Sequence, residues 1–152
     1  MAESEVLHAK HRLEYPYARS TGPIIGAFLT ALREGRFLGA TGTGGKIIVP
    51  PTEYDPITGD DVGDLVEVGP GGVIDSWAWV SHPLRKHPHQ TPFAWALITL
   101  DGADTGLLHT VAAPGPEALS TGARVTAKFR AESERIGSMA DIESFVLEGG
   151  GS

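Results

Sequence analysis

The side chains best suited to chemistry form a group of imidazoles and cations near the middle of the chain. His82, His87 and His89 lie in the stretch Ser-His-Pro-Leu-Arg-Lys-His-Pro-His-Gln, with Arg85 and Lys86 between them. Imidazoles at this spacing can bind zinc or nickel, but the two prolines keep the stretch extended, and no regular element brings three ring nitrogens to one point. We therefore expect a polar loop. Arg85, Lys86 and His87 in this loop suit an anionic ligand such as the phosphates of coenzyme A.

A glycine-rich tract, Gly39-Ala-Thr-Gly-Thr-Gly-Gly-Lys46, invites comparison with a phosphate-binding loop, in which glycine amides and a lysine cradle phosphates. The first glycine that such a loop requires would fall at Ala40, and the hydroxyl that holds magnesium would fall at Ile47. The preceding strand and the following helix are also missing from the pattern. The tract therefore does not predict nucleotide binding.

Catalysis by this chain alone is poorly supported by its other polar residues. No Gly-x-Ser-x-Gly motif marks a nucleophilic serine, and because the chain has no cysteine, thiol catalysis, thiolate zinc sites and disulfides are excluded. Asp101 and Asp104 are a pair of carboxylates, but they lie at an Asp-Gly turn between two apolar runs, where such side chains cap the backbone. Six further acidic residues with no basic residue among them predict a solvated face rather than a cation site: Glu53, Asp55, Asp60, Asp61, Asp64 and Glu67.

The first regular element that can position these groups is an amphipathic helix after residue 20. Pro23 suits its first turn, Thr21 can cap it, and Gly35 ends it. Its apolar side chains recur at helical spacing and form one stripe: Ile24, Ile25, Phe28, Leu29 and Leu32. Two interpretations of this stripe remain, because it can pack on its own domain or face a partner, and the first arrangement is the more common one.

From about residue 65 the pattern changes to short strands separated by Gly or Pro turns. These runs are rich in β-branched and aromatic residues, and they cover 65–68, 73–80, 93–100, 106–112, 124–129 and 142–147. A short helix at 116–119 lies between the third and fourth long strands, and five strands with a helical insertion before the fourth are the order of an OB-type closed barrel. We expect most of the aromatic side chains of these strands in the barrel interior: Trp77, Trp79, Phe93 and Trp95.

Length and charge fit one small, turn-rich, mostly β protein. The chain has 152 residues, of which 20 are Gly and 11 are Pro, and a formal net charge of -7. That charge disfavours a protein that gains its affinity by neutralising nucleic-acid phosphates or an anionic membrane surface. The N-terminus has no apolar signal segment and no run approaches about 18 apolar residues. We therefore expect a cytoplasmic protein without nucleic-acid or membrane partners.

The order of these features resembles the zinc-ribbon plus OB-fold family known as domain of unknown function thirty-five, whose members accompany thiolases and thiolase-like enzymes. The resemblance covers about residues 20–147 and rests on Leu32-Arg-Glu-Gly-Arg-Phe-Leu-Gly39, Val49-Pro-Pro51, Pro92-Phe-Ala-Trp-Ala-Leu-Ile-Thr-Leu-Asp-Gly102 and Thr121-Gly-Ala-Arg-Val125. It implies a mostly β fold in which an amphipathic helix and a rubredoxin-like zinc ribbon precede a five-stranded OB-fold barrel. We predict an N-terminal arm at 1–20, the helix and a degenerate ribbon at 21–65, the OB-fold at 66–147 and a linker-like tail at 148–152.

The ribbon of that family carries two Cys-x-x-Cys pairs, and the resemblance places the four ligand positions at Thr41, Gly44, Asp55 and Thr58. All four thiolates are therefore missing from this chain. A structural ribbon gains its folding energy from the metal. We expect this ribbon to bind no stoichiometric zinc and to be held by packing, by prolines in its turns or by a partner subunit.

The function that the resemblance implies is that of a non-catalytic accessory subunit. Such a subunit docks on a thiolase-like protein (a sterol-carrier-protein-type thiolase or aldolase), stabilises it and helps shape its acyl-CoA channel in lipid or steroid side-chain degradation. We expect a hetero-oligomer, no catalytic residue and no tightly bound cofactor in this chain, and a CoA thioester shared with the partner. Phe28, Leu32, Arg36 and Phe37 are the expected docking residues, because an apolar anchor beside an arginine is a common hot-spot composition.

Two other classes of function remain in competition with this one. A free-standing acyl-CoA binding module would use the barrel face with Arg85 and Lys86. Single-stranded nucleic-acid binding, which OB folds often perform with a basic groove, is disfavoured by the net charge of -7 and by the scarcity of Lys and Arg on the barrel strands.

Overall fold

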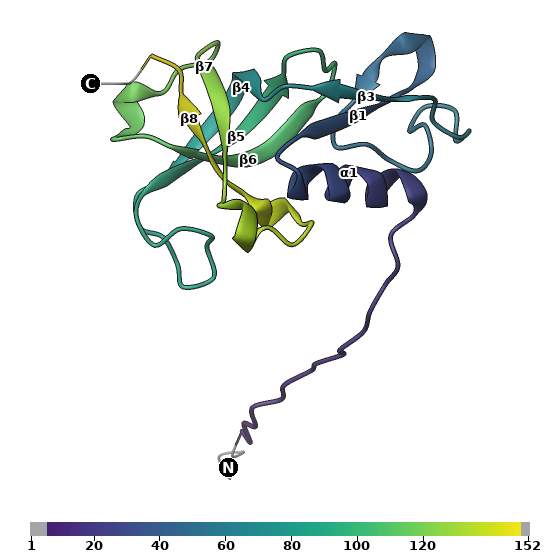
Figure 1. Cartoon of the computed structure of the whole chain (residues 1–152). Coiled ribbons are helices and arrows are strands. Elements are labelled where there is room, and N and C mark those ends of the chain that lie inside the picture. Colours follow the sequence, from purple (N-terminus) through teal and green to yellow (C-terminus); the bar gives the residue numbers. More distant parts are fainter. Residues whose placement is uncertain (1–5, 150–152) are drawn as a thin grey trace.

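A computed structural model describes residues 6–149, and Figure 1 shows their arrangement. The first five residues of the predicted arm and the last three of the predicted tail lie outside this range. Along the chain the elements are α1 (Pro23–Arg33), β1 (Phe37–Thr41), η1 (Thr43–Gly45), β2 (Ile47–Ile48), β3 (Leu65–Val68), β4 (Gly71–Val80), β5 (Phe93–Leu100), β6 (Gly106–Ala112), η2 (Pro116–Ala118), β7 (Arg124–Phe129), η3 (Glu132–Glu134), η4 (Met139–Asp141) and β8 (Ile142–Leu147), where η denotes a short 3-10 helix.

Five of the strands close a barrel in the order β4-β5-β6-β8-β7. Strand β4 pairs antiparallel with both β5 and β7, and the barrel closes where β6 and β8 run parallel at Val111 and Phe145. The short helix η2 lies between β6 and β7, so the helical insertion precedes the fourth barrel strand. The structure therefore confirms the predicted fold class, a mostly β protein with an N-terminal helix and an OB-type barrel.

Aliphatic side chains fill the barrel, because alternate residues of each strand point inward. On β5 the even-numbered positions, such as Ala96 and Ile98, are the buried ones, and this alternation places Trp95 on the outer face. Phe93 is fully buried, while Trp77 and Trp79 are half-buried against the core. Trp77 and Trp79 thus pack against the barrel core and Phe93 is buried, as expected, whereas Trp95 on the outer face departs from the expectation.

A second, smaller sheet has the strand order β2-β1-β3, with all pairs antiparallel. Strand β3 belongs to this sheet and pairs along β1 from Phe37 opposite Val68 to Ala40 opposite Leu65. The Phe37 ring lies 5.2 Å from the Phe129 ring and 6.1 Å from the Phe145 ring, centre to centre. This fully buried side chain therefore joins the small sheet to the barrel.

Helix α1 lies against β1 and begins at a cap that the sequence did not reveal. Its N-cap residue is Gly22 rather than Thr21, and no side chain at that position bonds to the helix. Instead Glu53 accepts hydrogen bonds from the backbone N–H groups of Ile24 (3.3 Å) and Ile25 (2.8 Å). A carboxylate at this end is favourable because the first N–H groups are unpaired and the helix dipole is positive there.

Residues 6–20 have no regular secondary structure, and Figure 1 shows them leading away from the domain as an extended segment. Several of their apolar side chains are exposed, including Leu7, Tyr15 and Tyr17. Within residues 6–149, no helix combines the length and the apolarity needed to cross a bilayer.

Candidate functional site

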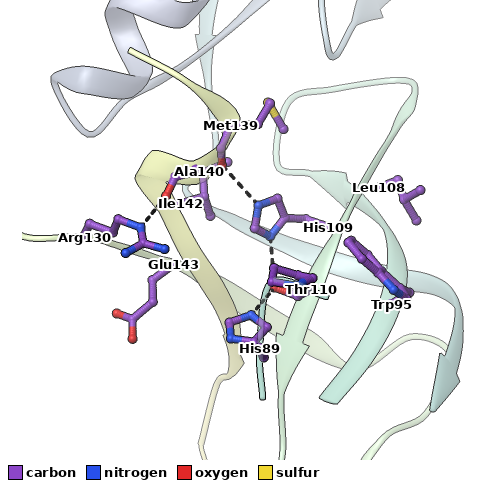
Figure 2. A pocket seen from close by; sticks show the side chains of 11 residues that line it. His89, Trp95, Leu108, His109, Thr110, Arg130, Met139, Ala140, Ile142 and Glu143 are labelled. Atoms are coloured by element: carbon purple, nitrogen blue, oxygen red, sulfur yellow. Dashed lines mark hydrogen bonds between the residues drawn. The ribbon is translucent and has the colours of Figure 1, made fainter. Parts of the chain in front are cut away.

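A pocket of about 350 Å³ opens between β6, the start of β8 and the loop that joins β4 to β5 (Figure 2). We call it the imidazole pocket, and its lining residues are Pro88, His89, Trp95, Leu108, His109, Thr110, Arg130, Met139, Ala140, Ile142 and Glu143. In OB folds, ligands bind on the face of strands 2 and 3 between the loop joining strands 1 and 2 and the loop joining strands 4 and 5. Here those loops are residues 81–92 and 130–141. The pocket therefore lies at the usual ligand-binding position of the fold.

Three side chains and one carbonyl form a directed hydrogen-bond chain along the pocket (Figure 2). The Met139 carbonyl can only accept, so His109 Nε2, at 3.4 Å, donates to it. His109 Nδ1 then accepts from the Thr110 hydroxyl at 3.4 Å, and that hydroxyl oxygen accepts from His89 Nε2 at 2.9 Å. This arrangement is satisfied with both imidazoles neutral.

Burial favours the neutral form of His109 and lowers its pKa below the ordinary value of 6.5. Hydrogen bonding to the backbone of Met139 and of Thr110 opposes this effect, and a positive charge on the neighbouring His89 would add to it. The His109 ring also packs edge-on against Phe145, with the ring centres 5.8 Å apart. At neutral pH the pocket therefore contains an uncharged imidazole in an apolar wall.

Each of the two charged side chains of the pocket has a partner within the chain, and the rest of the lining is mainly apolar. Arg130 Nε donates to the Ala140 carbonyl at 2.6 Å, and Glu143 forms an ion pair with Lys128 at 3.0 Å. The opposite wall is formed by Trp95, which Figure 2 shows beside His109. The pocket thus suits an apolar group that carries one hydrogen-bonding atom better than it suits a phosphate.

A second depression, of about 430 Å³, adjoins the imidazole pocket and is almost wholly apolar. We call it the apolar groove, and it is lined by Ile25, Phe28, Leu29, Pro50, Pro51, Leu97, Gly106, Leu107, Leu108 and Met139. Leu97 and Leu108 lie directly opposite each other on β5 and β6 and are 38% and 61% exposed. Leu108 and Met139 line both depressions, so groove and pocket form one surface. Contiguous exposed apolar side chains of this kind mark interaction sites.

The cationic loop residues predicted to contact coenzyme A lie near this surface but do not line it. Arg85 and Lys86 are exposed, and neither forms an ion pair with any side chain in residues 6–149. His87 shapes its own loop, because its Nδ1 accepts from the Leu84 backbone N–H at 3.1 Å and its ring packs edge-on against Phe93. Their role in binding coenzyme A stays a prediction. The histidines of this loop do not converge with other ligands, and the described residues hold no cluster of three metal-binding side chains.

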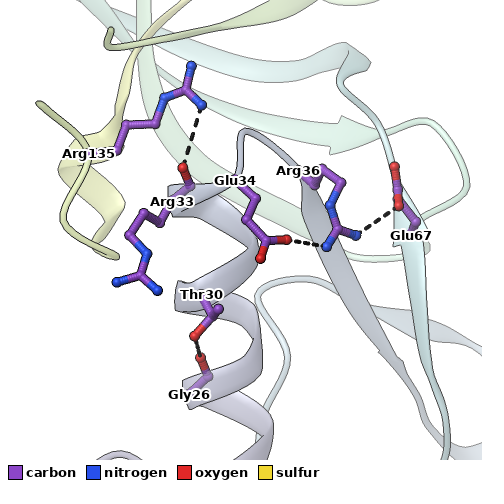
Figure 3. Close-up of polar contacts among 7 residues, drawn as sticks. All are labelled: Gly26, Thr30, Arg33, Glu34, Arg36, Glu67 and Arg135. Atoms are coloured by element: carbon purple, nitrogen blue, oxygen red, sulfur yellow. Dashed lines mark hydrogen bonds and ion pairs between the residues drawn. The ribbon is translucent and has the colours of Figure 1, made fainter. Parts of the chain in front are cut away.

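Three of the four predicted docking residues lie inside the protein. Phe28, Leu32 and Phe37 are almost fully buried in the chain's own core, because the stripe of α1 packs against β1 and the barrel. Only Arg36 lies at the surface, where it pairs with Glu34 and with Glu67, the latter at 3.0 Å (Figure 3). Both carboxylates raise the Arg36 pKa above its ordinary value. Of these three, Phe28 also lines the apolar groove, whereas Leu32 and Phe37 line neither depression and support the surface from inside.

The four positions at which the related family carries zinc ligands hold a different set of side chains in this chain. Thr41, Asp55 and Thr58 line one shallow depression, whereas Gly44 has no side chain to offer. The set supplies one carboxylate and two hydroxyls in place of four thiolates, which does not match the nitrogen and sulfur ligands of a structural zinc site. The carboxylate is also occupied, because Thr43 and Ile57 donate backbone hydrogen bonds to Asp55 and lower its pKa. The residues present do not fit zinc.

The sequence analysis did not identify Leu97, Leu108 and Met139 as parts of this surface. For the two leucines, the sequence carries a pattern that could have identified them. The alternation of β5 and β6 puts Leu97 and Leu108 out of phase with the buried side chains, which is the mark of an apolar outer face. No such signal exists for Met139, because a short 3-10 helix brings it to His109 from 30 positions further along the chain.

Comparisons with known proteins agree with the fold. Residues 65–130 match the family model described as "ChsH2, C-terminal OB-fold domain". Among solved structures, the chain is similar to a chain of the "Ltp2-ChsH2(DUF35) aldolase", with a TM-score of 0.62 and 18% identity over 86% of this chain and 97% of that one. It is also similar to a protein of unknown function from the DUF35 family of Sulfolobus solfataricus, with a TM-score of 0.57 and 20% identity over 84% of this chain and 85% of that one. No curated protein matches the sequence.

Both structures carry the name of the family that the sequence resembles, since DUF35 stands for domain of unknown function thirty-five. The family model carries the name ChsH2, which the first of these structures gives together with DUF35. The predicted resemblance is therefore confirmed, together with the loss of the four ribbon cysteines. At these identities the two solved structures establish the fold alone.

Proposed function

Because residues 65–130 match the family model of ChsH2 C-terminal OB-fold domains, we propose that this chain is a non-catalytic accessory subunit of a thiolase-like enzyme. The partner is a thiolase or aldolase of the sterol-carrier-protein type. It holds the catalytic residues and cleaves a carbon–carbon bond of an acyl-CoA in lipid or steroid side-chain degradation. The similarity to a chain of an aldolase named for two proteins, Ltp2 and ChsH2, supports a hetero-oligomer.

The observation that carries this proposal is the apolar groove, whose leucines stand exposed on a barrel that is otherwise well packed. Leu97 and Leu108 form a cross-strand pair, and covering them removes apolar surface from water. The groove reaches α1 on one side and η4 on the other. An open, almost wholly apolar surface of this kind suits a folded protein partner that covers it.

The imidazole pocket gives the proposed subunit its second task, which is to shape part of the acyl-CoA channel. Trp95, Met139 and Ile142 supply apolar contacts for an acyl group, and the neutral His109 offers one polar contact for a hydroxyl or carbonyl on it. Arg85 and Lys86, on the loop beside the pocket, are the proposed contacts for the coenzyme A phosphates. In this arrangement the thioester is shared between the two subunits.

The polar groups of the pocket support a non-catalytic role. The His89, Thr110 and His109 chain ends on the backbone carbonyl of Met139 rather than on a carboxylate that could orient and activate an imidazole. Glu143, the nearest candidate acid, is paired with Lys128. The groups that bind and orient the substrate are therefore present without an activated nucleophile or base.

A free-standing acyl-CoA binding module is the second candidate, and the imidazole pocket is the observation that favours it. Its volume of about 350 Å³ lies within the usual range for small-molecule sites. In that case the isolated chain binds coenzyme A thioesters without any partner. Calorimetry of the isolated chain with an acyl-CoA measures this, and the absence of heat at millimolar ligand removes this candidate.

Native mass spectrometry tests the accessory-subunit proposal. The chain is co-expressed with the thiolase-like protein encoded beside its gene, and the chain alone serves as the control. The proposal requires a heterocomplex of defined stoichiometry. A monomer or homodimer that does not bind the co-expressed thiolase-like protein contradicts the proposal.

A further inference from the structure

The ribbon-like segment contains two turns that are separate in sequence and meet at one carboxylate. The first turn spans residues 42–46 and the second spans residues 55–60. Asp55 is 5% exposed and is one of the few buried acidic side chains in residues 6–149. Its Oδ2 accepts from the Thr43 N–H at 2.6 Å, and its Oδ1 accepts from the Ile57 N–H at 2.7 Å and the Thr58 N–H at 3.1 Å.

The backbone around these turns is built for the close approach of this side chain. A Cβ atom on Gly42 would lie 2.8 Å from Asp55 Oδ2 and 2.6 Å from Ile48 Cδ1, so a larger residue there would displace one of these side chains. Gly42 also closes the first turn by donating its N–H to the Lys46 carbonyl at 2.7 Å. The second turn is closed by Asp55 itself, whose N–H donates to the Asp60 carbonyl at 2.7 Å and whose carbonyl accepts from Gly59 at 2.8 Å.

We propose that the Asp55 carboxylate replaces the metal of a zinc ribbon by tying the two turns together through backbone hydrogen bonds. In a zinc ribbon, two turns are joined because each contributes ligands to one ion. Here each carboxylate oxygen serves one turn, so a single anionic side chain does the joining. Hydrogen bonds to an ionised acceptor are the stronger kind, and a buried carboxylate needs several of them to be stable.

Within residues 6–149, no cationic side chain forms an ion pair with this carboxylate. Lys46 is the cation on the first turn and does not reach it, and the other charged side chain of the second turn, Asp60, is itself acidic. The neighbouring Asp61, which also lines the depression, is exposed to solvent. The three backbone N–H groups are therefore the partners that hold Asp55 in place.

The chemistry of the carboxylate predicts a graded response to substitution. Asp55→Asn keeps the shape but leaves one acceptor oxygen, so the amide NH2 group must face the N–H of one of the two turns. Hydrogen-exchange protection should then fall by about tenfold in one turn and persist in the other. Asp55→Ala removes both acceptors, and protection should be lost in both turns.

The experiment measures amide exchange at Thr43, Ile57 and Thr58 by NMR on the full chain, with barrel amides such as Ile98 as the internal reference. Asp60→Asn is the matched control, because it makes the same change in charge on the same turn at an exposed side chain with no hydrogen bond to the backbone of the first turn. If Asp55→Ala does not fold, Asp55→Asn still gives the one-turn result. Barrel protection should be unchanged in the variants that fold.

The same spectra test the absence of a metal requirement. The wild-type chain should keep its protection after treatment with a chelator, and added Zn²⁺ should neither shift these amides nor bind at one equivalent. Stoichiometric zinc with loss of protection on chelation overturns the proposal. So does an Asp55→Ala chain in which the three amides remain as protected as in the wild type.

Discussion

Substitution of Leu108 by aspartate should abolish partner binding without unfolding the chain. Complete burial of a leucine side chain gains about 1.5–3 kcal/mol. Leu108 is 61% exposed, so covering the rest of it gains about 0.9–1.8 kcal/mol, and Leu108→Ala should weaken the complex by about fivefold to twentyfold. Leu108→Asp also buries an unpaired carboxylate at a cost of several kcal/mol, so we expect a loss of more than about a hundredfold.

The affinity is measured by calorimetry of each variant with the purified thiolase-like partner at a fixed salt concentration. Leu84→Asp is the matched control, because Leu84 is 67% exposed, lies in the loop after β4 and lines neither depression. It should bind as the wild type does. The reasoning is refuted if Leu108→Asp retains wild-type affinity, or if Leu84→Asp weakens the complex as strongly.

Three further predictions concern the core, the pocket and the cationic loop. Phe37→Ala removes a fully buried ring and should cost about 3–5 kcal/mol of unfolding free energy, lowering the melting temperature by about 6–20 °C in thermal denaturation; a loss below about 1 kcal/mol would place Phe37 outside the core. Because burial lowers the His109 pKa, this imidazole is protonated in the unfolded chain before it is protonated in the folded chain as the pH falls below 6.5. The contribution of His109 to the free energy of unfolding is complete above pH 6.5 and declines below it. His109→Gln should therefore flatten the dependence of the urea midpoint on pH. An unchanged dependence of the midpoint on pH contradicts the buried neutral imidazole. The double charge reversal Arg85→Glu and Lys86→Glu should weaken acyl-CoA binding by about tenfold in a titration monitored by calorimetry, and unchanged affinity removes the loop from the site.

The barrel was predictable from the sequence because its signal is local. Alternating β-branched and apolar residues, such as those of the segment at 106–112, require a half-buried strand, and glycine or proline turns separate one strand from the next. The order of five strands with a helical insertion then limits the topology. These strand and turn signals do not depend on which residues from distant parts of the sequence pack against the strand.

The contacts between the ribbon-like segment and its surroundings were not predictable for the opposite reason. Glu53 and Asp55 belong to an acidic tract that we expected to be solvated, yet Glu53 caps α1 from 28 and 29 positions away and Asp55 reaches a turn 12 positions away. A sequence pattern shows that a carboxylate is present, but it does not show which unpaired backbone N–H groups the fold brings close to that carboxylate.

The docking role of the predicted residues stays a prediction, because an amphipathic stripe does not show which apolar surface covers it. Phe28 and Leu32 are buried in the chain's own core, and of the helix stripe Ile25, Leu29 and one side of Phe28 line the groove. The exposed pair on β5 and β6 emerged only when the register placed Leu97 opposite Leu108. Local periodicity thus identified the helix, and long-range packing decided which of its side chains remain accessible.

Hydrogen exchange of the chain alone and in its purified complex with the thiolase-like protein tests the central claim most directly. The account predicts that the complex slows exchange in peptides covering α1, β5, β6 and η4, which border the apolar groove. Peptides from the second ribbon turn, at 55–60, should exchange at the same rate in both states. Slower exchange confined to that turn, or no difference around Leu97 and Leu108, would contradict the proposal that this chain docks through the groove.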